Sequence, residues 1–239
     1  MTTDRPLGPL VPNWTPPPRP EPMVLKGRYC HLEPLRADAH AAMLFNAFNG
    51  HDWLWDYMPQ GPFHSAAQYH RWVKETEAQS NDLFFAIREH AGKPALGVAS
   101  LMRIFPADGT IELGNICISP ALQRTRATTE AFYKLMEWCF NAGYRRFEWK
   151  CNALNMPSRR AAQRLGLSYE GVFRQALVIK GRNRDTAWFA AIDSDWPALK
   201  SAFETWLDPR NFTADGDQIE SLSDLTRLVR VSSDPALSA

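Results

Sequence analysis

A short polar segment between a predicted strand and a predicted helix is the part of this sequence best suited to bind an anion. The strand ends in ICISP (116–120), and LQRTRATTEA (122–131) leads into a long helix. A strand that turns directly into a helix brings unbonded backbone N–H groups and the positive end of the helix dipole to one point. Such points bind phosphate and carboxylate groups. We therefore expect an anion site at residues 123–129.

Histidine and cysteine give no sign of a metal centre. The six histidines are scattered and form no HExxH array. The four cysteines form no CxxC pair and have no zinc-ligand spacing; they are Cys30, Cys117, Cys139 and Cys151. Because no histidine motif accompanies any of them, buried reduced thiols are favoured over a catalytic thiol. We predict no metal site.

Composition narrows the class of protein. The chain has 239 residues, 45% of them hydrophobic, which is enough to form a packed core. Its 27 basic and 26 acidic residues leave a net charge of +1, so nothing indicates a nucleic-acid partner. No apolar run approaches the roughly 18 residues of a membrane span, and the first residues do not resemble a signal peptide. We therefore expect a cytoplasmic protein that binds neither nucleic acid nor membrane.

The elements that must position the anion site alternate between strand and helix in the second half of the chain. This order predicts an α/β protein with a mixed sheet. A turn, KGRNRD (180–185), separates the last two strands. The predicted strands are 24–35, 83–89, 95–104, 110–120, 147–151, 167–179 and 186–192. The predicted helices are 38–48, 65–79, 129–143, 158–166, 194–207 and 218–229.

Three regions follow from this pattern. Residues 1–22 contain eight of the eighteen prolines and form an extended arm, because proline suits neither a helix nor a central strand. The arm either lies against the domain or binds a proline-recognising module. Residues 23–207 form one domain. Residues 208–239 form a C-terminal extension with one short helix.

A run of motifs follows the strand at 147–151. Asn155 and Ser158 form Asn-x-x-Ser, Leu165-Gly166-Leu167 ends a helix, and Glu170-Gly171 comes next. This order resembles the GNAT acetyltransferases, and most closely those of the RimJ/RimL type, which acetylate ribosomal-protein N-termini. The resemblance covers about residues 24–193. It implies the GNAT fold: a mixed, mostly antiparallel central sheet of about six to seven strands with one splayed pair, and helices on both faces.

The resemblance also implies that acetyl-CoA is the co-substrate. In the family, the turn reads Gln/Arg-x-x-Gly-x-Gly/Ala and holds the pyrophosphate. Here Gln123 keeps the first position, but Arg126 and Thr128 replace the small residues that let the backbone approach phosphate. Either the added charge and hydroxyl replace the lost contact, or coenzyme binding has been lost. The predicted coenzyme-binding residues are Ile116, Ile118, Gln123, Arg124, Arg126, Ala127, Thr128, Thr129, Asn155 and Ser158, with the two isoleucines acting through their backbone.

Two side chains are candidates for the chemistry implied by the resemblance. Glu112 occupies the place of the general base in histone-type acetyltransferases, and partial burial would raise its pKa toward the working range. The alternative is an ordinary strand glutamate facing water. Many GNAT enzymes protonate the leaving thiolate with a tyrosine, but Ala162 stands at that position. Ser158 therefore becomes the expected donor to the thiolate, and it is also placed to cap a helix.

The acceptor of the acetyl group is expected to be a primary amine, on a protein or peptide N-terminus or on a small molecule. The loop HDWLWDYMPQGPF (51–63) would line its pocket, with Trp53, Trp55, Tyr57 and Asp56 as candidate contacts. The aromatic residues alternatively form a small core of their own. A homodimer is compatible with the sequence. The alternative functions are a degenerate acyl-CoA-binding module and an interaction protein acting through the arm.

Overall fold

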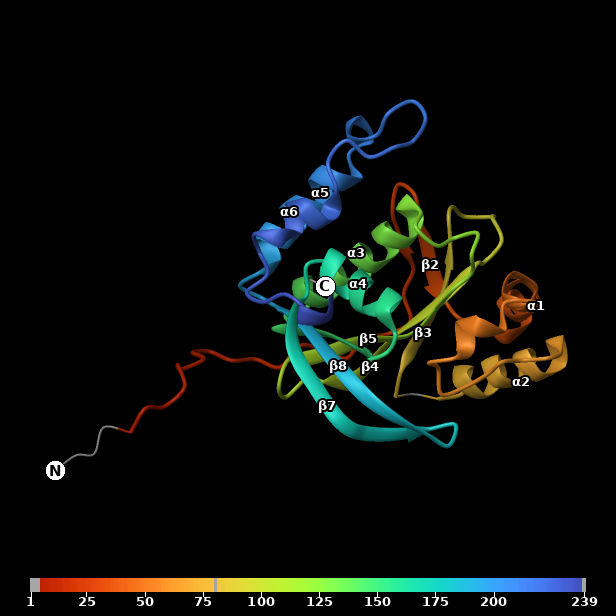
Figure 1. Ribbon diagram of the computed structural model, residues 1–239, viewed down its shortest axis with the longest axis horizontal. Helices are drawn as coiled ribbons and strands as arrows, with labels where there is room; N and C mark the ends of the chain where they lie inside the picture. The colour runs from red at the N-terminus through yellow and green to blue at the C-terminus, as the bar shows by residue number, and fades with distance from the viewer. Residues whose placement is uncertain (1–4, 80, 238–239) are drawn as a thin grey trace.

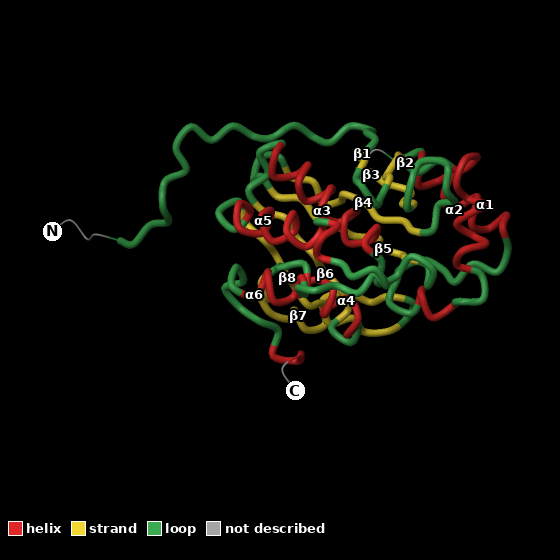
Figure 2. The backbone as a smooth tube through the Cα atoms, turned by 90° about the horizontal axis from the view of Figure 1, so that it is seen from above, coloured by secondary structure: helices red, strands yellow, loops and turns green. Residues whose placement is uncertain are grey.

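The computed structural model describes residues 5–79 and 81–237. It contains a single sheet with the strand order β1-β2-β3-β4-β5-β6-β8-β7 (Figures 1 and 2). The strands are β1 Leu25–Lys26, β2 His31–Pro34, β3 Leu83–Arg88, β4 Gly97–Phe105, β5 Thr110–Ile118, β6 Arg146–Asn152, β7 Ser168–Ile179 and β8 Arg182–Ile192. The sheet has eight strands because the predicted strand at 24–35 is broken by a turn, in which the Gly27 N–H donates to the Cys30 carbonyl at 2.9 Å.

One pair of neighbouring strands diverges. β5 and β6 are the parallel pair, and every other pairing in the sheet is antiparallel. They pair only over the first residues of each strand, from Thr110 with Arg146 to Glu112 with Glu148. Beyond these residues the two strands open into a wedge. The mixed sheet with a splayed pair, as predicted for the GNAT fold, is confirmed.

Helices cover both faces of this sheet, as predicted. α1 (Ala37–Phe48) and α2 (Ala66–Glu77) lie on one face, whereas α3 (Arg126–Asn141), α4 (Met156–Arg164) and α5 (Trp196–Leu207) lie on the other (Figure 1). Side chains alternate between the two cores because successive residues of a strand point to opposite faces. Val98 belongs to the α1–α2 core and its neighbour Ala99 to the core under α3.

The last two strands form a long hairpin that curves beneath the sheet toward α2 (Figure 1). Its turn contains only Lys180 and Gly181, both with positive φ, as expected for a tight two-residue hairpin turn. The predicted turn at 180–185 was therefore too long, and residues 182–185 extend strand β8. At the hairpin tip, the Lys180 ammonium donates to the Trp55 carbonyl at 2.8 Å.

Both terminal regions touch the domain. In the arm, Trp14 donates to the Ala107 carbonyl at 3.0 Å, and Arg19 donates to the Ile104 carbonyl at 3.0 Å. The C-terminal extension contains α6 (Leu222–Arg227) and returns to α4, where Asp234 forms a buried ion pair with Arg159 at 2.5 Å. Residues 1–4 of the predicted arm and 238–239 of the extension lie outside the described residues.

Candidate functional site

The turn between β5 and α3 leaves several backbone amides open. The Thr125 hydroxyl caps α3 by accepting from the Thr128 N–H at 3.2 Å, and the Gln123 N–H donates to the Ser119 carbonyl at 3.0 Å. Among the described residues, no acceptor is recorded for the four successive N–H groups from Arg124 to Ala127. These amides stand at the positive end of a 16-residue helix. They fit a negatively charged group such as a diphosphate.

The side chains that replace the small residues of the motif already have partners within the protein. The Arg126 guanidinium lies between two aromatic rings, 4.9 Å from the centre of Tyr29 and 4.5 Å from that of Phe212. The Thr128 hydroxyl donates to the Leu122 carbonyl at 2.6 Å, so its proton is used within the turn. Arg124 has a φ of 60°, and its exposed side chain has no recorded partner in the described chain. The structure therefore places backbone N–H groups, rather than the Arg126 charge or the Thr128 hydroxyl, at the predicted anion site.

The other predicted residues of the turn are fixed by the fold. The Gln123 side-chain amide donates to the Ile118 carbonyl at 2.9 Å and thus ties the turn to the end of β5. Ala127 is buried, and Thr129 is buried while its hydroxyl accepts from Arg164 at 3.1 Å. These contacts hold the amides in place rather than offering side chains to a ligand.

Strand β5 is irregular where it leaves β6. Cys117 pairs with Val98 and Gly114 with Ser100, so Asn115 and Ile116 together face Ala99 in a β-bulge. Asn115 has a φ of 50°. Beyond Glu112, none of the β5 residues is paired with β6. The Ile116 backbone and the Ile118 N–H therefore lie at the open side of the wedge, as the resemblance implies for the pantetheine arm, whereas the Ile118 carbonyl accepts from Gln123.

Helix α4 begins on the far side of this wedge. Asn155, not Ser158, is its N-cap, because the Asn155 side chain accepts from the Ser158 N–H at 3.2 Å. The predicted capping role of Ser158 was therefore wrong. The Ser158 hydroxyl instead accepts from the Trp149 indole at 3.0 Å. Burial raises the pKa of neighbouring Cys151 to about 11, a rise that Ser158 opposes, so this thiol stays protonated near neutral pH.

Glu112 is buried within a network of charges and does not face water as an exposed strand residue would. Its side chain is only 5% exposed. The Lys150 ammonium lies 3.0 Å from Glu112 Oε2 and 2.7 Å from Glu148 Oε2, while Arg103 Nε lies 3.4 Å from Glu112 Oε2. Arg103 reaches inward because a bulge in β4 gives it a φ of 44°.

Two carboxylates share one lysine in this network, but their pKa values are pushed apart. Burial raises the pKa of Glu112, and the nearby Lys150 and Arg103 charges only partly oppose that rise. Burial acts in the same direction on Glu148, but hydrogen bonds from Arg146 and Lys150 outweigh it and lower the pKa of Glu148. Environments that separate two titratable groups in this way distinguish the proton-exchanging group from the permanently ionised one. Of the two carboxylates, Glu112 is therefore the one better suited to take up a proton.

The fold places the residues predicted to contact the acetyl acceptor in different environments, some buried and some exposed. Trp55 is buried within an aromatic core, 5.6 Å from the Phe48 ring and 5.1 Å from the Phe63 ring. Its predicted contact with a bound amine is not available in this arrangement, and the interpretation as a small core of its own holds for this residue. Trp53 is 53% exposed. Asp56 is exposed and Tyr57 is partly exposed.

Some residues around Glu112 were missed by the sequence analysis. They are Arg103 on β4, Lys150 on β6, and Arg184 and Trp188 on β8. The strand RFEWKCN (146–152) did contain a signal, because Glu148 and Lys150 alternate with buried apolar residues. Polar residues at every second position indicate a face that is not part of the apolar core. Arg184 was missed because residues 180–185 were predicted to form a turn rather than part of a strand.

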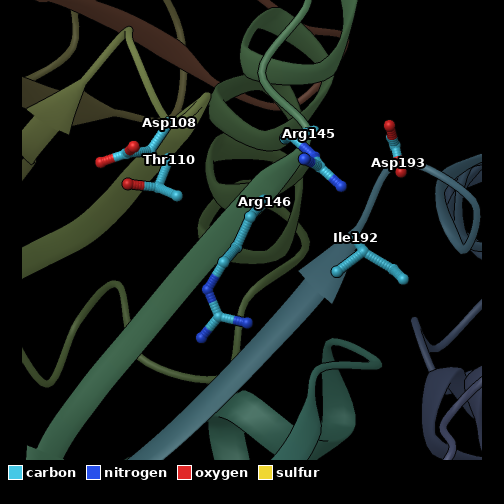
Figure 3. A pocket seen from close by; sticks show the side chains of 6 residues that line it. All are labelled: Asp108, Thr110, Arg145, Arg146, Ile192 and Asp193. Carbon is cyan, nitrogen blue, oxygen red and sulfur yellow. The ribbon is translucent and has the colours of Figure 1, made fainter. Parts of the chain in front are cut away.

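A shallow cavity of about 270 Å³ lies at the opposite end of β5 (Figure 3). It is formed where β5 and β6 begin and β8 ends, so it is distant along the strands from the turn that follows β5. Its lining residues are Asp108, Thr110, Arg145, Arg146, Ile192 and Asp193. This cavity is not part of the candidate site.

The described residues contain no group of three or more His, Cys, Asp or Glu side chains able to hold a metal ion. Within the same ranges, no helix has both the length and the apolar character needed to cross a bilayer.

Comparison with known proteins gives a consistent result. Residues 30–168 match the family described as the acetyltransferase (GNAT) domain. No curated protein matches the chain. A GCN5-related N-acetyltransferase from Brucella melitensis is 43% identical, with a TM-score of 0.88, covering 91% of this chain and 100% of its own. A probable GNAT-family acetyltransferase from Chromobacterium violaceum ATCC 12472 is 39% identical, with a TM-score of 0.77, covering 81% and 98%.

A more distant structure has only the fold in common. It is an acetyltransferase from Salmonella typhimurium that modifies the N-terminal serine of the 50S ribosomal subunit protein L7/L12. The identity is 20% and the TM-score 0.62, over 71% of this chain and 99% of that one.

Proposed function

The chain belongs to the GNAT acetyltransferase family and, on that premise, we propose that it transfers the acetyl group of acetyl-CoA to a primary amine by direct attack in a ternary complex. The acceptor amine is at a protein or peptide N-terminus or on a small molecule. The enzyme class follows from the family match and from the acetyltransferases that the chain resembles. The acceptor class, the site residues and the mechanism are our proposals.

One observation supports the proposal above all others: the four unbonded amides from Arg124 to Ala127 at the start of α3. They form a backbone cradle for the pyrophosphate of acetyl-CoA. The Arg126 side chain does not block this cradle, because its guanidinium is held by Tyr29 and Phe212. The departure from the glycine-containing motif is therefore compatible with coenzyme binding. The backbone of Ile116 and the N–H of Ile118 suit the pantetheine arm.

Acetyl-CoA supplies the activated acetyl group as a thioester, and the protein supplies positioning and proton transfer. Glu112 takes the proton from the acceptor ammonium, directly or through water, so that the amine becomes nucleophilic. Backbone N–H groups near Ile116 polarise the thioester carbonyl. The Ser158 hydroxyl donates a hydrogen bond to the thiolate as the C–S bond breaks, and the proton that the nitrogen loses on becoming an amide passes to the thiolate or to solvent. Bringing the two substrates together contributes about 7–11 kcal/mol to lowering the barrier.

The RimJ/RimL-like motifs support an amine at a peptide N-terminus. Asn155 and Ser158 lie at the start of α4 on one side of the wedge, as the Asn-x-x-Ser motif requires. The exposed residues Trp53 and Asp56 and the β7–β8 hairpin are available to contact the acceptor. A small amine remains the second acceptor class, because the fold is shared by enzymes with different substrates.

The test combines two measurements on the full chain. Calorimetric titration gives the affinity for acetyl-CoA, and a free-thiol assay over a panel of peptide and small amines gives turnover. We expect binding together with acetyl-CoA-dependent release of CoA thiol for at least one amine class, with the acetylated product identified by mass spectrometry. Binding without thiol release on any amine would instead identify a degenerate acyl-CoA-binding module. No binding at millimolar acetyl-CoA would rule out both.

A further inference from the structure

We infer that Arg184 binds a carboxylate group on the acceptor, so that the preferred substrate is an amine that also bears a carboxylate. This inference rests on the proposed acetyl transfer and adds the chemical class of the acceptor. The carboxylate belongs either to a small amino acid or to an acidic residue at a peptide N-terminus.

The short hairpin turn places Arg184 on the sheet beside the charged network. Because β8 begins at Arg182, Arg184, Thr186 and Trp188 lie on one face of the strand. Trp188 pairs with Lys150 of β6, and Thr186 pairs with Asn152. The Lys150 ammonium lies 3.9 Å from the centre of the Trp188 ring, on the same face as Glu112. Arg184 therefore lies two positions beyond Thr186, where β8 extends past β6 toward the open end of the wedge.

The polar atoms of these three β8 side chains have no hydrogen-bond partner in the described chain. They are Arg184 Nε, Thr186 Oγ1 and Trp188 Nε1, and all three are buried. Thr186 is 4% exposed. A buried polar group without a partner costs free energy comparable to a lost hydrogen bond, so native proteins seldom keep several together unless a ligand or water satisfies them. This strip of donors indicates a site for a hydrogen-bond acceptor.

The charges indicate the sign of that ligand. Lys150 lies between Glu112 and Glu148, and Arg103 also pairs with Glu112. The Arg184 guanidinium forms no ion pair within the described residues. Burial lowers its pKa, and the nearby Cys151 and Glu112 oppose that shift only in part. An arginine stays charged under these conditions. The face therefore has an excess positive charge at Arg184, which attracts an anion and repels a second cationic group on the acceptor.

A carboxylate fits this position better than a neutral group. A planar guanidinium binds a carboxylate through two parallel hydrogen bonds, and the adjacent Thr186 and Trp188 provide further donors. The Asp185 carboxylate does not compete for Arg184, because it accepts from the Gln175 N–H at 2.7 Å and the Asn183 amide at 2.9 Å. Glu112 and Arg184 thus contact the same acceptor molecule. Glu112 contacts its amine, and Arg184 contacts its carboxylate.

The experiment compares matched acceptors with the full-length enzyme. Each amino carboxylate, such as 4-aminobutanoate, is assayed beside its counterpart without the acid, here propylamine, and beside an aminoalkyl phosphate of similar length. Peptides beginning with an acidic residue are assayed beside their amide-containing counterparts. We expect kcat/KM to be about 10- to 100-fold higher for the carboxylate member of the preferred pair.

Substitutions of Arg184 test whether this residue causes the preference for carboxylate acceptors. Arg184→Gln is expected to raise KM for the carboxylate acceptor about 10- to 100-fold, to leave KM for the neutral acceptor unchanged, and to retain the acetyl-CoA affinity. Arg184→Lys should restore part of the preference. Arg182→Gln, an exposed residue on the same strand, is the matched control and should behave as the wild type.

The outcomes distinguish a failure of the carboxylate inference from a failure of the proposed acetyl transfer. Acetyl transfer with no preference for carboxylates, or a preference that Arg184→Gln leaves intact, would overturn the inference while the proposed function stands. A phosphate preferred over the carboxylate would also overturn it. If no amine is acetylated although acetyl-CoA binds, the proposed function itself fails.

Discussion

The charged face around Glu112 lies on strand β5 and the turn at Gln123–Thr129 follows that strand, but the two sites use different parts of the chain. At the turn, the groups available to a ligand are backbone amides, because the Arg126 side chain packs against Phe212 and the Thr128 hydroxyl donates to the Leu122 carbonyl. At the charged face, the groups are side chains from four strands: Arg103 of β4, Glu112 of β5, Lys150 of β6 and Arg184 of β8. The first site is positioned by secondary structure and the second by side-chain packing.

This difference determines how each site tolerates substitution. A backbone site keeps its function when a side chain changes, provided that the new side chain points away and φ remains accessible. A side-chain site fails when one group is removed, because the remaining buried charges lose their partners. Mutations should therefore have large effects at the charged face and small ones at the turn.

The largest effect is expected for Glu112→Gln. Removing the proton acceptor should lower kcat by about 10²- to 10⁴-fold. The affinity for acetyl-CoA, measured by calorimetry, should stay near that of the wild type, since Glu112 lies away from the turn. A variant that retains more than half of the wild-type kcat would exclude Glu112 as the general base.

Ser158→Ala should have the next largest effect. A hydrogen bond to a charged group contributes about 1.5–3 kcal/mol, which corresponds to about 10- to 100-fold in kcat. Stopped-flow or steady-state thiol release measures the rate, and calorimetry verifies that acetyl-CoA binding is unchanged. If kcat is unaltered, Ser158 only supports the Trp149 side chain and takes no part in the chemistry.

The pH profile provides a test of the charge network. Glu112 must be ionised to act, and burial raises its pKa, so kcat/KM should fall on acidification through a pKa above the ordinary value near 4.5. Lys150→Met removes a positive charge that lowers this pKa, and the acidic limb should therefore move to higher pH. Lys134→Met, which removes a lysine paired with Glu137 on α3, is the control. Both enzymes are assayed with the same acceptor, so that the titration of its amine affects the two profiles equally. An acidic limb that stays at the same pH would show that Lys150 does not influence the pKa of Glu112.

The smallest effect is expected for Arg126→Ala. The substitution removes the guanidinium contacts with Tyr29 and Phe212, at a cost of about 1 kcal/mol or a Tm lower by about 2–4 °C. It retains the N–H group of residue 126, so the Kd for acetyl-CoA should change by less than about threefold. Thermal unfolding and calorimetry on the same sample measure the two quantities. A large loss of affinity would mean that the side chain does contact the coenzyme.

The sequence was sufficient to predict elements whose signals are local. The helix predicted at 65–79 is α2, which Ser65 caps, and the strand predicted at 110–120 is β5, which has a bulge at Asn115–Ile116. The long order of strands and helices, with the Asn-x-x-Ser and Leu-Gly motifs, was enough to predict the fold. The predicted helix at 129–143 begins three residues after the actual start of α3, because Thr125 was not recognised as its N-cap.

Features that depend on distant parts of the chain could not be predicted in this way. The position of Arg126 is set by Tyr29 near the start of the domain and Phe212 in the extension. The burial of Trp55 depends on Phe48, Phe63 and Tyr69 meeting in one cluster. Arg184 was missed because the hairpin turn is shorter than predicted. Lys180 adopts the positive φ of a two-residue turn, so Arg184 belongs to strand β8. In each case tertiary packing, rather than local sequence, decides where the side chain goes.

The central claim is that backbone amides, and not side chains, hold the coenzyme at the start of α3. Arg126→Pro tests it directly beside Arg126→Ala, because the two variants differ chiefly in the N–H group of residue 126. Proline is tolerated at the first position of a helix, and Thr125 already has the extended conformation that proline requires before it, with φ −88° and ψ 161°. Calorimetric titration should show a Kd for acetyl-CoA about tenfold or more weaker for Arg126→Pro than for Arg126→Ala. Equal affinities in the two variants would contradict the claim.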